Sequence, residues 1–380
     1  MDKKITDIFE SIKGLNPYAD FLDGSTLSKV KSWTSTGCYA LNCIMSGSLY
    51  KGIPSGRVIG ISGPESCGKT FILNSIFREA ILEGRYVFDF DTENAQDEQT
   101  ARNLGCDPSK IVHIPVDTTA EFKIQSCKTL DKIIENKLQG KGLLALDSLG
   151  NLEGTKENAD VEKGKSVADQ GTRAKDLKGV LRALTHRAAR ADVPCIFTNH
   201  TYADPQQLYP TIIKNQSGGS GPLYMPSITI QLAKKGDSAD TTKQNTSKDA
   251  QEDSQSLTKG YNGMTVRALS IKNRFVPPFL ETEFYINFST GLSKYSGLLD
   301  IGLGYGAIVQ SGSTYALPDG KKLGYYKNWR DDADLWETKI MPDLEIRLQN
   351  ALKFGTFLKS KEVDNSKVDM SIKDTIESEE

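Results

Sequence analysis

The stretch that decides the fold is VIGISGPESCGKT, residues 58–70. Residues 58–62 form a short run of mostly apolar side chains, which is typical of a buried strand. Residues 63–70, GPESCGKT, match the pattern G-x-x-x-x-G-K-[ST], and helical spacing of apolar residues continues over 69–83. A strand before this motif and a helix after it are the context of a phosphate-binding loop. The stretch therefore predicts such a loop within an α/β core.

The motif assigns a role to each part of the loop. Its glycines allow backbone N–H groups to wrap around phosphate oxygens, and the helix that follows adds the positive end of its dipole. Lys69 is expected to reach the β- and γ-phosphates, and Thr70 to ligate Mg²⁺. A chance match is the alternative, and the flanking strand and helix argue against it. The predicted nucleotide-binding residues are Gly63, Pro64, Glu65, Ser66, Cys67, Gly68, Lys69 and Thr70.

Strands and helices alternate along the chain after this loop. Short apolar runs predict strands at 86–90, 111–116, 143–146 and 195–198, and helical patterns lie near 119–138 and 166–190. This βαβ alternation predicts an α/β fold with a mainly parallel sheet flanked by helices on both faces. Residues 265–273 and 280–288 also have strand patterns, and we expect them to extend the sheet in the antiparallel direction.

Changes in composition divide the chain into parts. We expect an N-terminal helical segment over 1–50, a core over 51–290, a small α/β C-terminal domain over 291–360 and an acidic, mobile tail over 361–380. The N-terminal segment has apolar residues from Ile5 to Ile12 at helical spacing, and a second helix is expected around 39–46. Residues 236–260 contain no aromatic residue, so this insertion is predicted to be disordered.

The overall composition excludes several classes of protein. The chain has 380 residues, of which 38% are hydrophobic and 25% charged, and a formal net charge of -2. No apolar run approaches the roughly 20 residues of a membrane span, and the N-terminus lacks the apolar region of a signal peptide. The six cysteines form no C-x-x-C pair, so a zinc site is not expected. These features favour an intracellular protein that would bind nucleic acid only through a local basic surface.

Two carboxylates follow predicted strands. Asp147 ends the apolar run LLALD, where it would lie near the phosphate-binding loop and hold Mg²⁺ through water. Glu93 follows FDFDT, and a carboxylate at that strand end is a candidate for activating water. For Asp147 the alternative is a solvated loop start, which its pairing with the loop argues against. For Glu93 a helix cap or surface cluster is an equally good interpretation from the residues alone.

Several ordered motifs resemble the RecA family of strand-exchange recombinases, closest to the UvsX-type enzymes of tailed phages. They are GRVIGISGPESCGKT, FDFDTENAQD, LLALDSLGNLEG, TRAKDLKGVLRALTHRAARADVPCIFTNHTY, GGSGPLY, IKNR and YSGLLDIGLGYG. The resemblance runs from about residue 35 to about 355. It implies a RecA-type ATPase core, an N-terminal helix within the polymerisation segment 1–50 that packs on the neighbouring protomer, and ATP with Mg²⁺ at the interface between protomers. It also implies a helical filament on single-stranded DNA that pairs it with homologous double-stranded DNA and exchanges strands.

The resemblance also implies roles for individual residues. Glu93 matches the catalytic glutamate and Asp147 the Mg²⁺-linked acid. His200, after Asn199, matches the position that senses the γ-phosphate. Thr100 stands where the family usually has a tyrosine that stacks on adenine, so this chain departs from the pattern there.

Lys272 and Arg274 match a pair of cations that reaches the ATP bound by the next protomer and stabilises charge on the γ-phosphate, as arginine fingers do. From residues 270–279 alone, a charged and solvent-exposed strand end was the preferred interpretation. The resemblance makes the role at a neighbouring protomer the stronger hypothesis.

Two stretches, 148–171 and 201–224, match the DNA-facing loops of the family. Both follow predicted strands, contain glycine and have few core residues, although the first is unusually acidic. The helix after the first loop carries cations at Lys175, Lys178 and Arg182, which share one face. A solvated helix face is the alternative to phosphate contact. The candidate DNA-binding residues are Lys178, Arg182, Tyr202, Tyr209, Ile212 and Lys214.

The sequence therefore favours an ATP-dependent recombinase that forms filaments in the cytoplasm of a bacterial or phage-infected cell. Its expected partners, besides DNA and further copies of itself, are a single-strand-binding protein and a loading mediator. No association with a membrane is expected. The alternatives are a RecA-core hexameric helicase or another RecA-like motor or switch ATPase, and a DNA-binding mediator with a vestigial ATPase.

Overall fold

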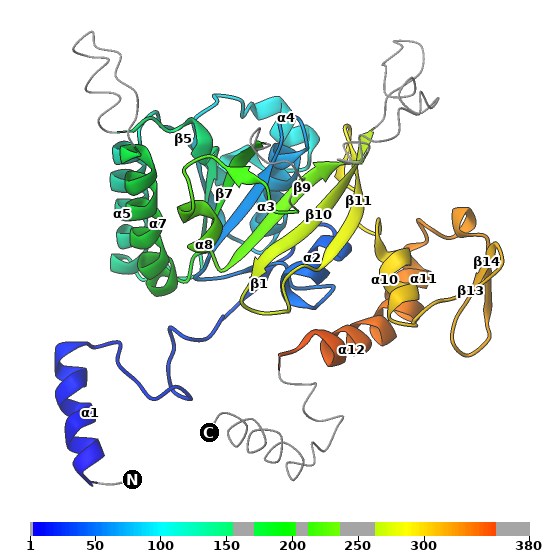
Figure 1. The fold of residues 1–380 in the computed structure, drawn as a ribbon, viewed down its shortest axis with the longest axis horizontal. Helices are drawn as coiled ribbons and strands as arrows, with labels where there is room; N and C mark the ends of the chain where they lie inside the picture. Colours follow the sequence, from blue (N-terminus) through cyan, green and yellow to red (C-terminus); the bar gives the residue numbers. More distant parts are fainter. Residues whose placement is uncertain (1–2, 155–170, 203–211, 236–262, 355–380) are drawn as a thin grey trace, which may run out of the picture.

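The computed structural model describes residues 3–154, 171–202, 212–235 and 263–354 (Figure 1). The described helices are α1 (Lys3–Leu15), α2 (Tyr39–Ser46), α3 (Lys69–Leu82), α4 (Glu98–Asn103), α5 (Thr119–Glu135), α7 (Thr172–Ala191), α8 (Gly221–Tyr224), α10 (Leu298–Gly304), α11 (Ala333–Leu335) and α12 (Met341–Leu352). The described strands are β1 (Trp33–Thr34), β2 (Ile53–Pro54), β3 (Val58–Gly63), β4 (Tyr86–Asp91), β5 (Ile111–Pro115), β6 (Gly142–Asp147), β7 (Cys195–Tyr202), β8 (Asn215–Gln216), β9 (Ile228–Lys234), β10 (Gly263–Asn273), β11 (Glu281–Asn287), β12 (Gly291–Leu292), β13 (Val309–Ser311), β14 (Thr314–Ala316) and β15 (Lys322–Gly324).

A large sheet with the order β12-β11-β10-β9-β3-β7-β6-β4-β5 forms the centre of the molecule, and β8 adds to β7. The strands from β9 to β5 in this order are parallel to their neighbours, whereas β10, β11 and β12 are antiparallel. The predicted strands and the antiparallel extension are thereby confirmed. Helix α4 lies where a helix was expected after Glu93, whereas strands β8 and β9 were not among the predicted elements.

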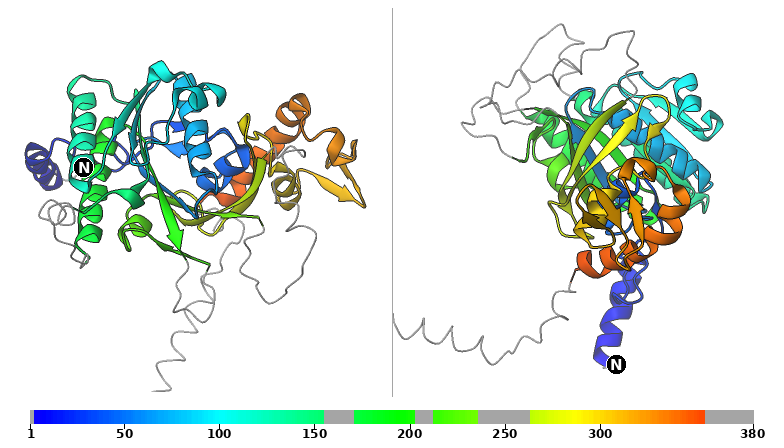
Figure 2. Two further views of the ribbon diagram at one scale, coloured as in Figure 1. Left: turned by 90° about the horizontal axis from the view of Figure 1, so that it is seen from above. Right: turned by 90° about the vertical axis from the view of Figure 1, so that its right-hand side faces the viewer.

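Helices cover both faces of the sheet because successive residues of each buried strand point to opposite sides. In β6, Leu143 and Ala145 belong to a core shared with α2 and α3, and Leu144 and Leu146 belong to a core shared with α5 and α7. Figure 2 shows the green α5 and α7 on one side of the sheet and the blue α3 on the other. The fold predicted from the alternation of strands and helices is confirmed.

Local signals explain where the flanking helices begin. Thr118 caps α5 by accepting a hydrogen bond from the backbone N–H of Glu121 at 3.2 Å, and the Glu121 carboxylate accepts one from the Thr118 N–H at 3.2 Å. This capping box satisfies N–H groups that have no partner inside the helix. Helix α3 begins immediately after Gly68, so its first turn is the end of the phosphate-binding loop.

The C-terminal elements pack on the side of the core that α2 covers. Leu344, Leu348 and Leu352 of α12 are buried in the same hydrophobic cluster as α2 and α3. The Glu345 carboxylate accepts hydrogen bonds from the Ser48 hydroxyl at 2.6 Å and from the Leu49 N–H at 2.7 Å. The small sheet β13-β14-β15 lies at the far end of this region (Figure 1). This region shares its hydrophobic core with the rest of the molecule. The expected domain boundary near residue 291 stays a prediction.

Helix α1 stands apart from the sheet and its flanking helices (Figure 1). Ile5, Ile8 and Ile12 lie along one stripe of the helix, and each is about half exposed. An arm joins α1 to the core, and its Ser28 carbonyl accepts a hydrogen bond from Arg57 at 2.8 Å. An apolar stripe that remains exposed is a feature of surfaces that bind another protein.

Some sequence predictions fall on residues outside the described ranges. These are the insertion 236–260, the tail 361–380, most of the first DNA-facing loop and residues 203–211 of the second. The helix predicted from 166 is described from Thr172 onward. A search of the described helices finds none that is both long and apolar enough to cross a bilayer.

Candidate functional site

The phosphate-binding loop lies between β3 and α3, at the carboxyl end of the parallel strands. Gly68 has a φ of 88°, and a Cβ atom there would lie 2.4 Å from Ile286 Cδ1, so this position requires glycine. Ser66 also has a positive φ, of 53°. Together these turns direct backbone N–H groups and the N-terminus of α3 toward one point, as in a phosphate site.

Lys69 lies beneath this loop and is 7% exposed. Its ammonium group donates to the carbonyl oxygens of Gly63 at 3.2 Å and Pro64 at 2.8 Å. The charge is therefore held at the floor of the loop, beside the N-terminus of α3. A buried ammonium with carbonyl partners only is available to pair with a bound phosphate.

Asp147, the last residue of β6, lies directly beside the first turn of α3. Its carboxylate accepts a hydrogen bond from the Thr70 hydroxyl at 2.8 Å and another from the Thr198 hydroxyl. Burial raises the pKa of Asp147, and the hydrogen bonds from Thr198 and Thr70 oppose that rise.

The pairing of Asp147 with Thr70 fits a Mg²⁺ site. A hydroxyl and a carboxylate 2.8 Å apart are the hard oxygen ligands that Mg²⁺ prefers, and such sites use few protein ligands together with substrate phosphates. The described residues contain no cluster of three or more His, Cys, Asp or Glu that could hold a metal by themselves. Thr70 and Asp147 are thus suited to Mg²⁺ that arrives with a nucleotide.

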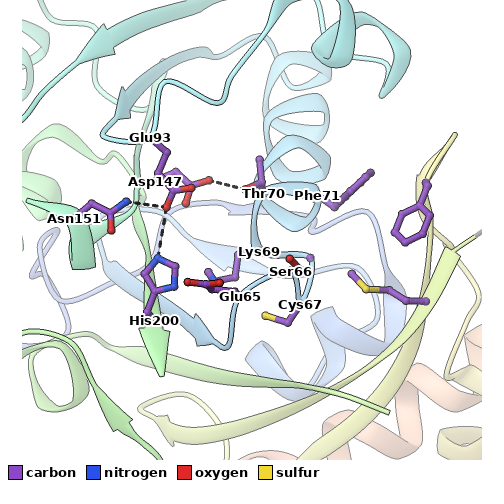
Figure 3. Close-up of a pocket in the computed structure, with 13 residues that line it drawn as sticks. Glu65, Ser66, Cys67, Lys69, Thr70, Phe71, Glu93, Asp147, Asn151 and His200 are labelled. Carbon is purple, nitrogen blue, oxygen red and sulfur yellow. Dashed lines mark hydrogen bonds and ion pairs between the residues drawn. The ribbon is translucent and has the colours of Figure 1, made fainter. Parts of the chain in front are cut away.

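Glu93 follows β4 and faces the same space from the other side (Figure 3). Its Oε1 accepts a hydrogen bond from Asn151 Nδ2 at 3.1 Å and lies 3.5 Å from His200 Nε2. His200 Nε2 also lies 3.3 Å from the Ser148 hydroxyl. A carboxylate held by two polar side chains, one on β7 and one in the turn after β6, is suited to orient a water molecule.

These groups line one cavity of about 750 Å³, drawn in Figure 3. The site lies where open α/β sheets bind ligands, at the carboxyl ends of the strands. Its lining residues are Glu65, Ser66, Cys67, Gly68, Lys69, Thr70, Phe71, Glu93, Asp147, Asn151, His200, Met264 and Phe288. The structure thus brings together the loop, both predicted carboxylates and the predicted sensor.

One wall of the cavity consists of residues that the sequence interpretation missed. Phe71 and Phe288 lie with their ring centroids 5.8 Å apart, and Met264 lies beside them on β10. No local signal marks Phe288, which is 217 residues after Phe71 and reaches the cavity only through the antiparallel extension of the sheet. Thr100, in contrast, does not line the cavity. Its backbone N–H and hydroxyl donate to Asp97 at the start of α4.

Lys272 and Arg274 lie at the amino ends of the parallel strands, whereas the phosphate-binding loop lies at their carboxyl ends. Lys272 pairs in register with Thr229 at the beginning of β9, and β9 runs parallel to β3 toward the loop. The Lys272 ammonium donates to the carbonyl oxygens of Pro226, at 2.7 Å, and Tyr224. Arg274 is exposed just beyond the end of β10. Neither residue therefore contacts the cavity of its own chain.

The predicted DNA-binding residues are partly described. Lys175, Lys178 and Arg182 are exposed along one face of α7. Arg173 is instead committed to the carbonyl oxygens of Leu152, at 2.7 Å, and Gly150.

In the second loop, Ile212 is 70% exposed and Tyr202 is 53% exposed, with the Tyr202 hydroxyl on the Gln216 carbonyl at 3.2 Å. Lys214 is partly buried, and its backbone N–H donates to Gln231. Tyr209 lies outside the described residues.

The fold and the cavity define a P-loop nucleotide-binding protein with a mainly parallel sheet. A family model described as the RecA N-terminal domain matches residues 21–293, which is most of the chain. The chain therefore belongs to the RecA family of recombinases, whose members bind DNA and form filaments.

Three relatives illustrate this similarity. The recombination and repair protein of Enterobacteria phage T4 is 27% identical over 318 residues, which cover 81% of this chain and 74% of that protein. Protein RecA of Paracoccus denitrificans is 25% identical over 327 residues, covering 85% of this chain and 82% of that one. Protein RecA of Anaplasma marginale is 28% identical over 331 residues, covering 84% and 83%.

Proposed function

We propose that this protein is a DNA-dependent ATPase that polymerises on single-stranded DNA, pairs it with homologous double-stranded DNA and exchanges the strands. The observation that carries the proposal is the single cavity in which Lys69, the pair of Thr70 with Asp147, and Glu93 face one another. These are the groups that bind a triphosphate, hold its metal ion and activate water. Membership of the RecA family supplies the link from ATP turnover to DNA.

In this proposal ATP binds with its phosphates on the loop. The N-terminus of α3 and the loop N–H groups receive the phosphate oxygens, and Lys69 moves its hydrogen bonds from loop carbonyls to the β- and γ-phosphates. Thr70 and Asp147 would hold Mg²⁺, which when bound would supply positive charge to the phosphates. Phe71 and Phe288 form the apolar side of the cavity, and we assign them the contact with the adenine ring in place of Thr100.

Glu93 is assigned the orientation of the attacking water, and His200 the detection of the γ-phosphate. His200 contacts Glu93 and Ser148, and it lies two residues before the end of β7, where the second DNA-facing loop begins. Asn199 binds the Ser217 carbonyl at the far end of that loop at 2.9 Å. Loss of the γ-phosphate would therefore change contacts at the start of the loop and at Ser217 within it.

The cations at the amino ends of the parallel strands complete the site from a second copy. Lys272 and Arg274 are assigned to the triphosphate of the next protomer, where they stabilise charge on the γ-phosphate. Lys178 and Arg182 are assigned to DNA phosphates, and Tyr202, Tyr209, Ile212 and Lys214 to the DNA strand. We place this assembly in the cytoplasm of a bacterial or phage-infected cell, with a single-strand-binding protein and a loading mediator as further partners.

The proposal is tested by formation of joint molecules between a single strand and a homologous duplex in the presence of ATP and Mg²⁺. The full-length protein should form joint molecules and hydrolyse ATP faster with single-stranded DNA. Glu93→Gln should bind ATP and DNA but lose hydrolysis, whereas Lys69→Ala should lose ATP binding itself. A loaded filament that forms no joint molecule would show that strand exchange is not its activity.

A further inference from the structure

The loop that carries Glu93 is held by the buried carboxylate of Asp91, the last residue of β4. Asp91 Oδ1 accepts a hydrogen bond from the Glu93 N–H at 2.8 Å, and Oδ2 accepts one from the Gln96 N–H at 3.2 Å. Asp91 is 3% exposed. The backbone of Glu93 therefore depends directly on the orientation of this one carboxylate.

Other contacts fix the two ends of the same loop, and Asn151 and His200 contact the Glu93 carboxylate, but the backbone N–H of Glu93 is bound by Asp91. The Thr92 hydroxyl donates to the carbonyl oxygens of Asp147 and Ser148, both at 3.1 Å. The Gln96 side chain exchanges hydrogen bonds with Asn74 of α3, at 2.9 and 3.3 Å. Between Thr92 and Gln96, the backbone N–H of Glu93 donates its hydrogen bond to Asp91.

His113 supplies a third donor to this carboxylate from the neighbouring strand. It lies on β5, the strand at one edge of the sheet, and its Nε2 is 3.1 Å from Asp91 Oδ2. Its side chain is 40% exposed, so it covers Asp91 on the side that faces solvent. Burial by itself would raise the pKa of Asp91, but the hydrogen bonds from Glu93, Gln96 and His113 outweigh it and lower the pKa.

We propose that His113 is a positioning residue for hydrolysis. By donating its Nε2–H to Asp91, it holds the carboxylate in the orientation that binds the N–H of Glu93, and through it sets the direction in which the Glu93 side chain points. The inference rests on the proposed role of Glu93 in activating water. A neutral imidazole with its proton on Nε2 is sufficient for this hydrogen bond.

The geometry distinguishes this role from a structural one. His113 is partly exposed on an edge strand and belongs to neither hydrophobic core, so its removal should cost little stability. The nearest cavity-lining group that it affects is Glu93, whereas the phosphate-binding loop follows β3 and Lys69 begins α3. A change at His113 should therefore alter turnover and leave ATP binding unchanged.

The test uses the full-length protein and measures DNA-stimulated ATP hydrolysis. His113→Leu, which has no donor, should lower kcat roughly ten- to a hundredfold with no change in KM for ATP, because misaligned catalytic groups cost rates of this order. His113→Asn, which is polar but too short, should behave in the same way and replaces the leucine variant if that one fails to fold. His113→Gln keeps a donor of similar reach and should stay within about threefold of the unchanged protein.

Val112→Gln is the matched control, since Val112 is the exposed neighbour on the other face of β5 and should have no effect. Equal losses in the Gln and Leu variants of His113, a raised KM, or unchanged kcat in the Leu variant would each overturn the inference. Glu93→Gln is measured in parallel. If it is inactive while His113→Leu turns over normally, only the role of His113 fails; if it hydrolyses ATP normally, the assignment of Glu93 fails and the inference falls with it.

Discussion

Lys272 shows how its surroundings set the chemistry of a single side chain. Burial and, after it, the nearby charge of Arg274 lower the pKa of its ammonium group to about 8. Below that pH the group is a cation, and above it the group becomes neutral. A residue assigned to a neighbour's γ-phosphate should thus lose its effect in alkaline solution.

DNA-stimulated hydrolysis should therefore decline as the pH rises through about 8 or somewhat above, because a bound phosphate raises the pKa again. Lys272→Arg should move this decline to higher pH, since a guanidinium group stays charged. The measurement is kcat against pH, with Lys322→Arg, a change at an exposed lysine of β15, as the control. Superimposable alkaline limbs in the Lys272→Arg variant and the unchanged protein would contradict the assignment.

Asp89 is a second residue whose burial has a measurable effect. Burial, with the charges of Asp91 and Asp147, raises its pKa from 3.8 to about 8. Between these values the folded protein keeps a proton that the unfolded chain releases. The free energy of unfolding should therefore fall as the pH rises from about 4 to about 8, by up to about 1.4 kcal/mol per pH unit from this group.

Asp89→Asn should remove that contribution and raise the stability at pH 8. Urea unfolding at several pH values, without nucleotide or metal, measures the effect. Asp334→Asn, a change at an exposed carboxyl, is the control and should leave the slope in place. An unchanged slope in Asp89→Asn would show that the carboxyl is ionised in the folded protein.

Single residues of the site differ in how far the sequence predicts them. The loop residues follow from a contiguous motif, and Asp147 follows from an apolar run that ends in an acid. Phe288 and Asn151 follow from neither, because they reach the cavity through strand pairing and loop geometry that no local pattern encodes. His113 was likewise not predicted, since its partner Asp91 lies 22 residues away on a different strand.

At the level of elements, the capping box of α5 offers a direct test of local stability. Thr118→Ala should lower the free energy of unfolding by about 1 kcal/mol, because the Glu121 N–H loses its acceptor. Thr129→Ala in the same helix is the matched control, since the exposed Thr129 hydroxyl only bonds Gln125 within the helix at 2.9 Å. It should be neutral or slightly stabilising. Equal losses in both variants, measured by urea unfolding, would argue against the cap.

Strand β9 shows why some elements escape prediction. Its residues Thr229 and Gln231 are polar yet buried, so the segment lacks the continuous apolar run of a central strand. The Thr229 hydroxyl bonds the Leu223 carbonyl at 3.3 Å, and Gln231 bonds the Ile212 carbonyl at 2.8 Å. These partners lie in the second DNA-facing loop and α8. The polar residues of β9 thus support the loop above it, which only the folded structure reveals.

At the level of the whole molecule, the exposed stripe of α1 predicts self-association. Ile8→Asp places a charge in the middle of that stripe, where Ile8 is 56% exposed. It should raise the protein concentration needed for filament formation at least tenfold. Leu138→Asp, the same charge at an exposed apolar residue after α5, should have no such effect. Light scattering with single-stranded DNA and ATP measures assembly. Normal assembly of Ile8→Asp would show that α1 is not part of the contact.

The sequence predicts where the core strands lie along the chain because each is a short local pattern, but it does not predict that distant parts share a core. Ser48 and Glu345 are 297 residues apart and form a hydrogen bond of 2.6 Å. The change in composition near residue 291 predicts a small C-terminal domain, and its Leu344 and Leu348 lie in the same hydrophobic cluster as residues of α2. Contacts over such a separation depend on the finished fold.

This shared core has a consequence for biosynthesis. Chains emerge from the ribosome N-terminus first, and domains generally fold in that order. Here α2 leaves the ribosome early, but other buried side chains of its hydrophobic cluster, from Trp336 to Leu352, are among the last described residues to appear. A nascent or prematurely terminated chain would present a bare apolar surface on α2 to chaperones and proteases. Synthesis of α12, the last described helix, is therefore needed before this hydrophobic cluster can be complete.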